Sequence, residues 1–238
     1  MTELERAADR VARARRLVFL GGAGVSTASG IPDFRSAQGI GQGLDFETLL
    51  SRSYFAAHPR EFFDFYKSHM VYPQAQPNLV HRTLARWERE GRVRAILTQN
   101  IDGLHQKAGS EKVLELHGSV LRNHCTRCGK SYGLDAVMAA PGVPRCACGG
   151  IIKPDVVLYE EPLPQTVMEE TVDALMDADL LIVAGTSLRV YPAAGMVEYA
   201  THAAKLLFNR EGTPLDGLFD QVILGDLAEI FRRIDPQD

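Results

Sequence analysis

The sequence has no hydrophobic run long enough to cross a membrane as a helix. Such a helix needs about 20 consecutive apolar residues, and the nearest stretch, residues 180–185, has only the length of a strand. The first 16 residues interleave charged and apolar side chains. No run of about 7–15 apolar residues follows them, as a signal peptide requires. We therefore expect a cytoplasmic protein without a membrane partner.

An excess of positive charge is also missing. The 26 lysines and arginines stand against 30 aspartates and glutamates, which gives a net charge of −4. We do not expect such a chain to be drawn as a whole to nucleic acid or anionic lipid. The hydrophobic share of 45% and the charged share of 24% are those of a globular protein, which excludes the disordered and fibrous classes.

Short apolar runs alternate with helix-like stretches along most of the chain. We expect buried strands at residues 17–20, 93–98, 113–116, 179–184, 205–208 and 222–224. Helices are expected at the N-terminus and at residues 78–91 and 165–176. This alternation predicts an α/β fold with a doubly wound, Rossmann-like parallel sheet.

Two stretches interrupt the alternation. Residues 37–76 begin rich in glycine and continue as an aromatic-rich helical run, which predicts a helical insertion behind a loop. Residues 122–154 hold all four cysteines and little apolar content, so we expect a small module that something other than a hydrophobic core holds together. The remaining residues, 1–36, 77–121 and 155–238, are expected to form the sheet domain.

The four cysteines have the spacing of a metal site. Cys125 and Cys128 form one pair, and Cys146 and Cys148 form a second pair after a gap of 17 residues, close to the zinc-ribbon pattern. Four thiolates at about 2.3 Å close a tetrahedral zinc site, so zinc here would be structural. A cytosolic disulfide and free thiols are the alternatives. The basic residues of the module are too few to predict nucleic-acid binding.

A glycine-rich turn follows the first expected strand. Residues 21–24 read Gly-Gly-Ala-Gly, and residues 25–29 can open a helix, whose N-terminus would favour a phosphate. The ordinary dinucleotide fingerprint needs a third glycine where this chain has Thr27. The turn indicates a dinucleotide or its pyrophosphate, with a tight structural turn as the alternative.

Five blocks occur in a specific order along the chain. They are GAGVSTASGIPDFRS at residues 22–36, TQNID at residues 98–102, His117 with Gly118, the four cysteines, and GTSL at residues 185–188. In sequence and order they resemble the sirtuin family of NAD-dependent protein deacylases. The resemblance covers nearly the whole chain. It implies a Rossmann-like NAD-binding domain with NAD as cosubstrate, a structural zinc ion, and acetyl-lysine proteins or peptides as partners.

The resemblance assigns cofactor contacts to the glycine turn and to positions after the later strands. These residues are Ala23, Thr27, Phe34, Arg35, Gln99, Asn100, Ile101, Asp102, His117, Thr186, Ser187, Asn209 and Asp226. Open α/β sheets bind ligands at the carboxyl ends of their strands, and Arg35 offers the planar donors that suit pyrophosphate. Core packing of Phe34, helix capping by Asn100 or Asp102, and a turn at Asp226 are the alternatives.

His117 follows the expected strand 113–116, again at the carboxyl edge of the sheet. A histidine with a pKa of about 6.5 is mostly neutral near pH 7 and can accept a hydroxyl proton. The resemblance makes His117 the catalytic base and places Asn100 and Asp102 with it in the catalytic set.

Residues 153–161 lie where sirtuins clamp an acyl-lysine peptide as an added strand. The resemblance places Val157 in the tunnel for the substrate lysine. Family members commonly show an aromatic pair, glycine and glutamate here, and Leu158, Tyr159 and Glu160 replace three of these residues. The preference for peptide sequence is therefore not predicted.

The helical insertion also departs from one branch of the family. Sirtuins that prefer succinyl or malonyl lysine carry Tyr-x-x-Arg, whereas this chain has Tyr66-Lys67-Ser68-His69. Without the guanidinium, an acidic acyl group loses a charged partner worth roughly 1.5–3 kcal/mol. We expect acetyl or longer neutral acyl groups as substrates, and no desuccinylase activity.

The resemblance thus implies an NAD-dependent protein-lysine deacetylase. It would transfer the acyl group from lysine to ADP-ribose and release nicotinamide. Two other classes remain as alternatives: an ADP-ribosyltransferase or NAD hydrolase that uses the same pocket, and a non-enzymatic module that binds ADP-ribose or nucleic acid.

Overall fold

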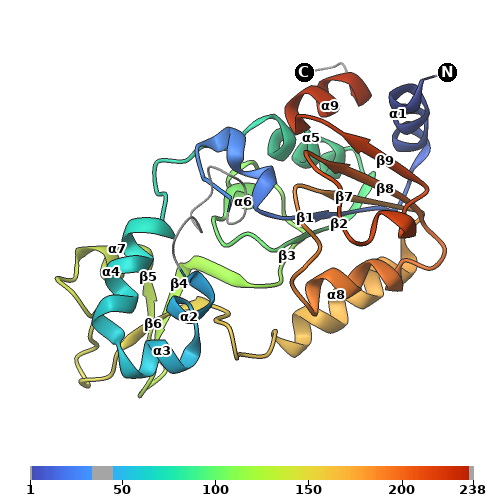
Figure 1. Cartoon of the computed structure of the whole chain (residues 1–238). Helices are drawn as coiled ribbons and strands as arrows, with labels where there is room; N and C mark the ends of the chain where they lie inside the picture. The colour runs from blue at the N-terminus through green and yellow to red at the C-terminus, as the bar shows by residue number, and fades with distance from the viewer. Residues whose placement is uncertain (1, 34–44, 236–238) are drawn as a thin grey trace.

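A computed structural model describes residues 2–33 and 45–235, which contain a six-stranded parallel sheet (Figure 1). Its strands are β1 (Leu17–Gly21), β2 (Val93–Thr98), β3 (Val113–Glu115), β7 (Leu180–Ala184), β8 (Ala204–Asn209) and β9 (Gln221–Leu224). Their order is β3-β2-β1-β7-β8-β9. The chain builds the sheet outward from β1 on one side and outward from β7 on the other, which is the doubly wound arrangement that the sequence predicts.

The expected strands and the two expected internal helices are confirmed. These helices are α5 (Leu79–Arg89) and α8 (Gln165–Asp177). The sequence sets the start of α5, because the side-chain oxygen of Asn78 accepts the N–H of Val80 at 2.9 Å and so caps the helix. Residue 78 thus ends the preceding loop instead of belonging to the helix.

Residues 25–29 do not open an α-helix. The chain forms two three-residue 3₁₀ helices there, η1 (Ala23–Val25) and η2 (Thr27–Ser29). The N–H groups of Val25 and Ser26 bond to carbonyls three residues earlier, which is the tighter 3₁₀ pattern. Gly30, with a φ of 82°, then ends the second turn in a left-handed conformation that glycine adopts readily.

Helices cover both faces of the sheet (Figure 1). One face is packed by α1 (Glu3–Arg13), α5 and α9 (Leu227–Ile234), and the other by α8 and the 3₁₀ helix η3 (Ala193–Tyr199). Successive residues of β1 alternate between the two layers: Phe19 joins the first core, while Val18 and Leu20 join the second. This double burial explains why the strands are continuous apolar runs in the sequence.

A second body contains the cysteines and the helical insertion. Its antiparallel sheet has the order β5-β4-β6. Its elements are α2 (Phe46–Leu49), α3 (Arg52–Ala57), α4 (Pro59–His69), β4 (Gly118–Cys125), β5 (Ser131–Gly133), α7 (Leu134–Ala139) and β6 (Ile152–Val156). The aromatic side chains of α4, including Phe62, pack with Val137 and Ile152 in one core. The cysteine module therefore does share a hydrophobic core, contrary to our expectation, because the insertion supplies the apolar groups that the module lacks.

The predicted domain boundaries stay predictions, although two strands cross them. β4 begins at Gly118 and β6 ends at Val156, so the small sheet extends beyond residues 122–154. The first part of the insertion, with Phe34 and Arg35 just before it, lies outside the described residues. No helix among the described residues is long and apolar enough to span a membrane.

Candidate active site

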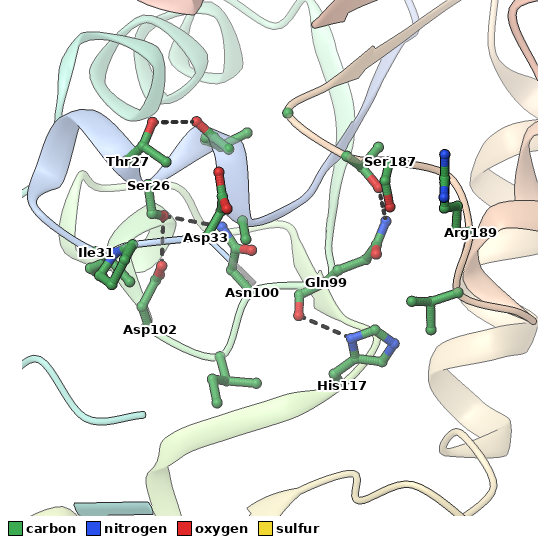
Figure 2. Close-up of a pocket in the computed structure, with 18 of the residues that line it drawn as sticks. Ser26, Thr27, Ile31, Asp33, Gln99, Asn100, Asp102, His117, Ser187 and Arg189 are labelled. Atoms are coloured by element: carbon green, nitrogen blue, oxygen red, sulfur yellow. Dashed lines mark hydrogen bonds between the residues drawn. The ribbon is translucent and has the colours of Figure 1, made fainter. Parts of the chain in front are cut away.

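A cavity of about 530 Å³ lies where the strand order of the sheet reverses, between β1 and β7. Figure 2 shows its side chains converging from the turn after β1, the end of β2 and the segment after β7. Residues 156–161, after β6, also line it. Open α/β sheets bind ligands at this switch point, so the topology alone marks the cavity as the candidate site.

The glycine turn after β1 packs directly against a glycine turn after β7. The N–H of Gly24 donates to the carbonyl of Gly185 (2.8 Å), and a Cβ on Gly24 would lie 2.8 Å from the Cα of Gly185. Close backbone packing between the two turns therefore explains the glycine at position 24. Ala23 and Thr27 line the cavity beside it, as a role in cofactor binding requires.

Ser26, Asn100 and Asp102 form one hydrogen-bonded group in the cavity (Figure 2). The Ser26 hydroxyl donates to the Asp102 carboxylate at 2.6 Å and accepts a hydrogen bond from the Asn100 amide at 3.1 Å. The same amide donates to the carbonyl of Gly22 at 3.1 Å. These bonds fix the loop after β2 against the glycine turn.

The carboxyl group of Asp102 is mostly buried and accepts hydrogen bonds there. Burial raises its pKa, while hydrogen bonds from Ser26 and from the N–H of Leu104 oppose the rise. Leu104 begins α6 (Leu104–Lys107), so one carboxylate oxygen has the helix-start role that we kept as an alternative. An acidic group repels a phosphate and accepts an N–H, and this end of the cavity therefore suits a carboxamide.

Polar groups from three strand ends meet on the other side of the cavity. The Gln99 amide, after β2, donates to the hydroxyl of Thr186 at 3.1 Å. The Asn209 amide, at the end of β8, donates to the carbonyl of Thr186 at 3.0 Å. Ser187 lines the cavity next to them. Hydroxyls and amides of this kind can bind ribose hydroxyls and phosphate oxygens.

Asp226 lies beyond this row, at the start of α9. Its carboxylate accepts the N–H of Glu229 at 3.1 Å and caps the helix, and it is 3.9 Å from Arg210. Asp226 therefore has a local structural role as a helix cap, which differs from the turn that is its alternative in the sequence. Asp226 also lines the cavity, so it remains in the candidate set.

His117 has one ring nitrogen held and the other available. Its Nδ1 is 3.0 Å from the carbonyl oxygen of Gln99. Because a carbonyl can only accept, Nδ1 carries the proton and Nε2 is the basic nitrogen of the neutral ring. Figure 2 shows Nε2 pointing away from Gln99. Burial lowers the pKa of His117, with the bond to Gln99 opposing the shift, so the ring has the neutral form that a general base needs.

The segment after β6 brings Val157 next to this histidine. The N–H of Val157 donates to the backbone carbonyl of His117 at 3.0 Å, and both residues line the cavity. Ile101 lines it from the loop after β2. The candidate base, the candidate lysine-tunnel residue and the candidate cofactor residues of the described chain therefore share one cavity.

Residues of α4 also reach the cavity. Tyr66 and His69 line it, and the buried hydroxyl of Tyr66 has no partner within the described chain. Lys67 points elsewhere, because its ammonium donates to the carbonyls of Ala140 at 2.6 Å and Gly142 at 3.0 Å. The lysine cannot replace the arginine that this helix lacks while it ties α4 to the cysteine module.

The four cysteine sulfurs meet at one point of the small body. All lie within 4.8 Å of one another, with Cys125 and Cys148 at 3.4 Å and Cys128 and Cys146 at 3.6 Å. A zinc tetrahedron with bonds of about 2.3 Å sets its sulfurs about 3.8 Å apart, so the cluster fits one zinc ion. The cysteines form no disulfide, which makes the disulfide alternative wrong.

Backbone N–H groups favour the thiolate form of two of these cysteines. N–H groups of Cys128 and Cys148 hold the pKa of the Cys125 and Cys146 thiols, respectively, below its ordinary value. Zinc binds the thiolate and not the thiol. The four-sulfur set leaves no open position, so the ion that it fits is structural.

Ser26 is a candidate functional residue that the sequence analysis missed. Its side chain is only 1% exposed, yet it links Asn100 to Asp102. It stands inside the glycine-rich block, which was the available signal. Its carboxylate partner is 76 positions away, and no local spacing in the sequence shows that the two side chains meet.

The chain matches one protein family and its curated relatives along most of its length. The Sir2 family profile matches residues 22–192. An NAD-dependent protein deacetylase of Cutibacterium acnes is 52% identical over 235 residues, covering 97% of this chain and 96% of the relative.

Two solved structures share the fold along nearly their whole length. A Sir2 variant with a deacetylated p53 peptide and 3′-O-acetyl ADP ribose has a TM-score of 0.93 at 38% identity, covering 99% of this chain and 98% of its own. A structure described as Sir2, p53 peptide and NAD⁺ has a TM-score of 0.88 at 38% identity. The match covers 100% of this chain and 98% of the solved chain. The chain therefore belongs to the Sir2 family.

Proposed function

We propose that this protein is an NAD-dependent protein-lysine deacetylase. It transfers the acyl group of acetyl-lysine to ADP-ribose and releases nicotinamide. The observation that carries this proposal is His117: its Nδ1–H is fixed by the Gln99 carbonyl, and its basic Nε2 lies in the cavity that the glycine turn and Val157 also line. The name of the Cutibacterium acnes relative, at 52% identity, supports the same activity.

Different groups of cavity residues bind different parts of NAD. Ser26, Asn100 and Asp102, with Ile101, form the end that suits the carboxamide of nicotinamide. The remaining proposed contacts, to ribose and phosphate, are Ala23, Thr27, Gln99, Thr186, Ser187, Asn209 and Asp226. Phe34 and Arg35 complete the proposed set from outside the described residues. Bound NAD supplies an anomeric carbon with nicotinamide as its leaving group.

His117 supplies the base. Its Nε2 accepts a proton from a ribose hydroxyl, and the imidazolium that results keeps its Nδ1–H on the carbonyl of Gln99, which stabilises the positive charge. Because burial lowers the pKa of His117, the ring is neutral and ready to accept this proton near pH 7. The histidine thus acts on the acyl acceptor, and the proton is held at Nε2.

The proposed acyl substrate is neutral. Val157 lines the path of the lysine, and the part of the cavity near α4 is lined by Tyr66, His69 and Met70. The ammonium of Lys67, the one lysine of α4, is bound to the cysteine module. A succinyl carboxylate would therefore be buried without the charged partner that such a group needs.

One experiment separates this function from its alternatives. Purified protein is incubated with NAD and an acetyl-lysine peptide, and products are identified by mass spectrometry. We expect nicotinamide, deacetylated peptide and O-acetyl-ADP-ribose, formed only when both substrates are present. Nicotinamide release from NAD alone would instead identify an NAD hydrolase, and a mass gain of ADP-ribose on protein would identify an ADP-ribosyltransferase. A succinyl peptide in parallel should give no product.

A cytoplasmic location is part of this proposal. The four cysteines are free and clustered, and thiolates for zinc stay reduced in the cytosol.

A further inference from the structure

Glu160 has a backbone conformation that disfavours its own side chain. Its φ is 74°, and among the described residues only Glu160 and Leu188 are non-glycine residues with a positive φ. This left-handed region brings Cβ close to backbone carbonyl oxygen and is populated mainly by glycine. A glutamate here needs a contact that compensates for the backbone strain.

The carboxylate of Glu160 makes that contact. It accepts two hydrogen bonds from Ser53, one from the backbone N–H at 2.9 Å and one from the hydroxyl at 2.8 Å. Ser53 lies in the first turn of α3, where backbone N–H groups have no partner within the helix. Glycine at position 160 would relax the backbone but could not reach Ser53.

The contact lies at one end of a short bridge between the two bodies. Next to it, the N–H of Arg52 donates to the carbonyl of Tyr159 at 3.0 Å, and the N–H of Tyr159 donates to the carbonyl of Leu50 at 3.0 Å. At the other end, Val157 bonds to His117. Residues 157–160 therefore run from the proposed base to the helical insertion, along the cavity.

The inner part of this bridge has its own support. The Glu161 carboxylate accepts the N–H of Leu158 at 2.9 Å and pairs with Lys153 at 3.0 Å. This pair fixes the turn after β6, and the hydrogen-bond partners of its side chains in the described chain all lie within residues 153–161. Leu158 packs in the core of the insertion, and the outer contact, Glu160 with Ser53, adds a side-chain hydrogen bond that crosses to it.

We propose that Glu160 is a positioning residue for the peptide substrate, acting through Ser53 to hold residues 157–159 in the shape that pairs with an acyl-lysine peptide. This inference rests on the proposed deacetylase function. A segment that binds a peptide through its backbone gains affinity when it is already ordered, because binding then costs less conformational entropy. His117 is held independently by Gln99, so the effect falls on peptide binding and not on the base.

The test compares four variants with the wild type: Glu160→Gly, Glu160→Gln, Ser53→Ala, and Ser53→Ala combined with Glu160→Gly. The kcat, the KM for acetyl-peptide and the KM for NAD are measured for each. Glu61→Gln, at an exposed position of α4 in the same body, serves as the control. Calorimetry identifies any variant whose melting temperature falls.

We expect Glu160→Gly to raise the peptide KM by about threefold to tenfold, as the loss of an exposed charge-assisted contact implies. The kcat and the KM for NAD should stay within about twofold. Glu160→Gln keeps an acceptor oxygen, so its peptide KM should lie between those of the wild type and Glu160→Gly. Ser53→Ala should not raise the peptide KM further when it is combined with Glu160→Gly, because the two side chains act as a unit.

Two results would overturn the inference. One is a peptide KM for Glu160→Gly that equals or improves on the wild type, since backbone relaxation would then be the whole effect. The other is a full additional loss from Ser53→Ala in the glycine background. Failure of the proposed function looks different, because the wild type itself would then show no peptide-dependent nicotinamide release.

Discussion

The two bodies of this protein fix their halves of the cavity by different means. In the sheet domain, Gln99, Asn100 and Thr186 lie at the ends of strands whose residues are almost fully buried, and side-chain amides of Gln99 and Asn100 hydrogen-bond those ends to their neighbours. In the small body, one aromatic core, four cysteine sulfurs and a few polar links such as Glu160 with Ser53 do this work. Changes in the first body should therefore alter chemistry and cofactor binding, and changes in the second should alter folding and peptide binding.

Loss of zinc should have the largest effect, because it should unfold the small body and leave the sheet domain folded. Structural zinc sites contribute on the order of 10 kcal/mol to folding, and in the described residues the small body otherwise depends on the core that α4 shares with the cysteine module. We expect Cys128→Ser to lose its metal and to unfold the β4–β6 sheet, while the six-stranded sheet remains. Zinc content by atomic absorption and hydrogen exchange of both sheets measure this. Thr126→Ser, in the same turn, is the control, and full protection of β4–β6 in a zinc-free variant would contradict the prediction.

The sheet domain should have the opposite weakness, toward acid. His81 and His105 are buried with their ring centroids 4.7 Å apart. Burial lowers the pKa of His81 to about 4, and that of His105 well below its ordinary 6.5. The unfolded chain binds protons at both residues below pH 6.5 and the folded chain does not, so the free energy of unfolding falls from pH 6.5 toward pH 4. The slope is about 1.4 kcal/mol per pH unit for each histidine.

Urea unfolding at pH 7 and pH 5 measures this slope. His105→Gln should flatten it, because one of the two buried imidazoles is gone. His202→Gln, at an exposed position, should leave it unchanged. Zinc content is checked at both pH values, so that metal loss from the small body is not counted. An equal slope in the wild type and His105→Gln would show that the acid sensitivity lies elsewhere.

Removal of the base tests whether chemistry belongs to the sheet domain alone. We expect His117→Ala to lower kcat by at least about a hundredfold, the low end of what a positioned general base contributes. The KM for peptide should change little, because the hydrogen bond from Val157 goes to the backbone carbonyl of residue 117, which alanine keeps. Steady-state kinetics at pH 7 measure both. A variant with near wild-type kcat would remove the imidazole from the mechanism.

The sequence predicts the sheet domain better than the small body. The reason is the separation along the chain between the residues that make contact. Buried parallel strands are continuous apolar runs, and the cysteine pairs have a metal spacing, so both can be identified locally. The contact of Ser53 with Glu160 joins residues 107 positions apart, and the contact of Ser26 with Asp102 joins residues 76 apart. Neither has a local pattern. The 3₁₀ turns after β1 have no local pattern either, and there Gly24 packs against Gly185, which lies 161 positions away.

The smallest effect expected in the sheet domain separates cofactor binding from the base. Ser26→Ala leaves the Asn100 amide and the Asp102 carboxylate without their shared hydroxyl, and the loss of such a buried hydrogen bond costs about 1–1.5 kcal/mol. We expect kcat/KM for NAD to fall by about fivefold to tenfold, with the peptide KM unchanged. The pKa of Asp102 should rise further, because the Ser26 hydroxyl is the larger of the two contacts that lower it. The loss should therefore be greatest at low pH, where that carboxyl is protonated first, and a pH-independent loss would show that Ser26 acts by packing alone.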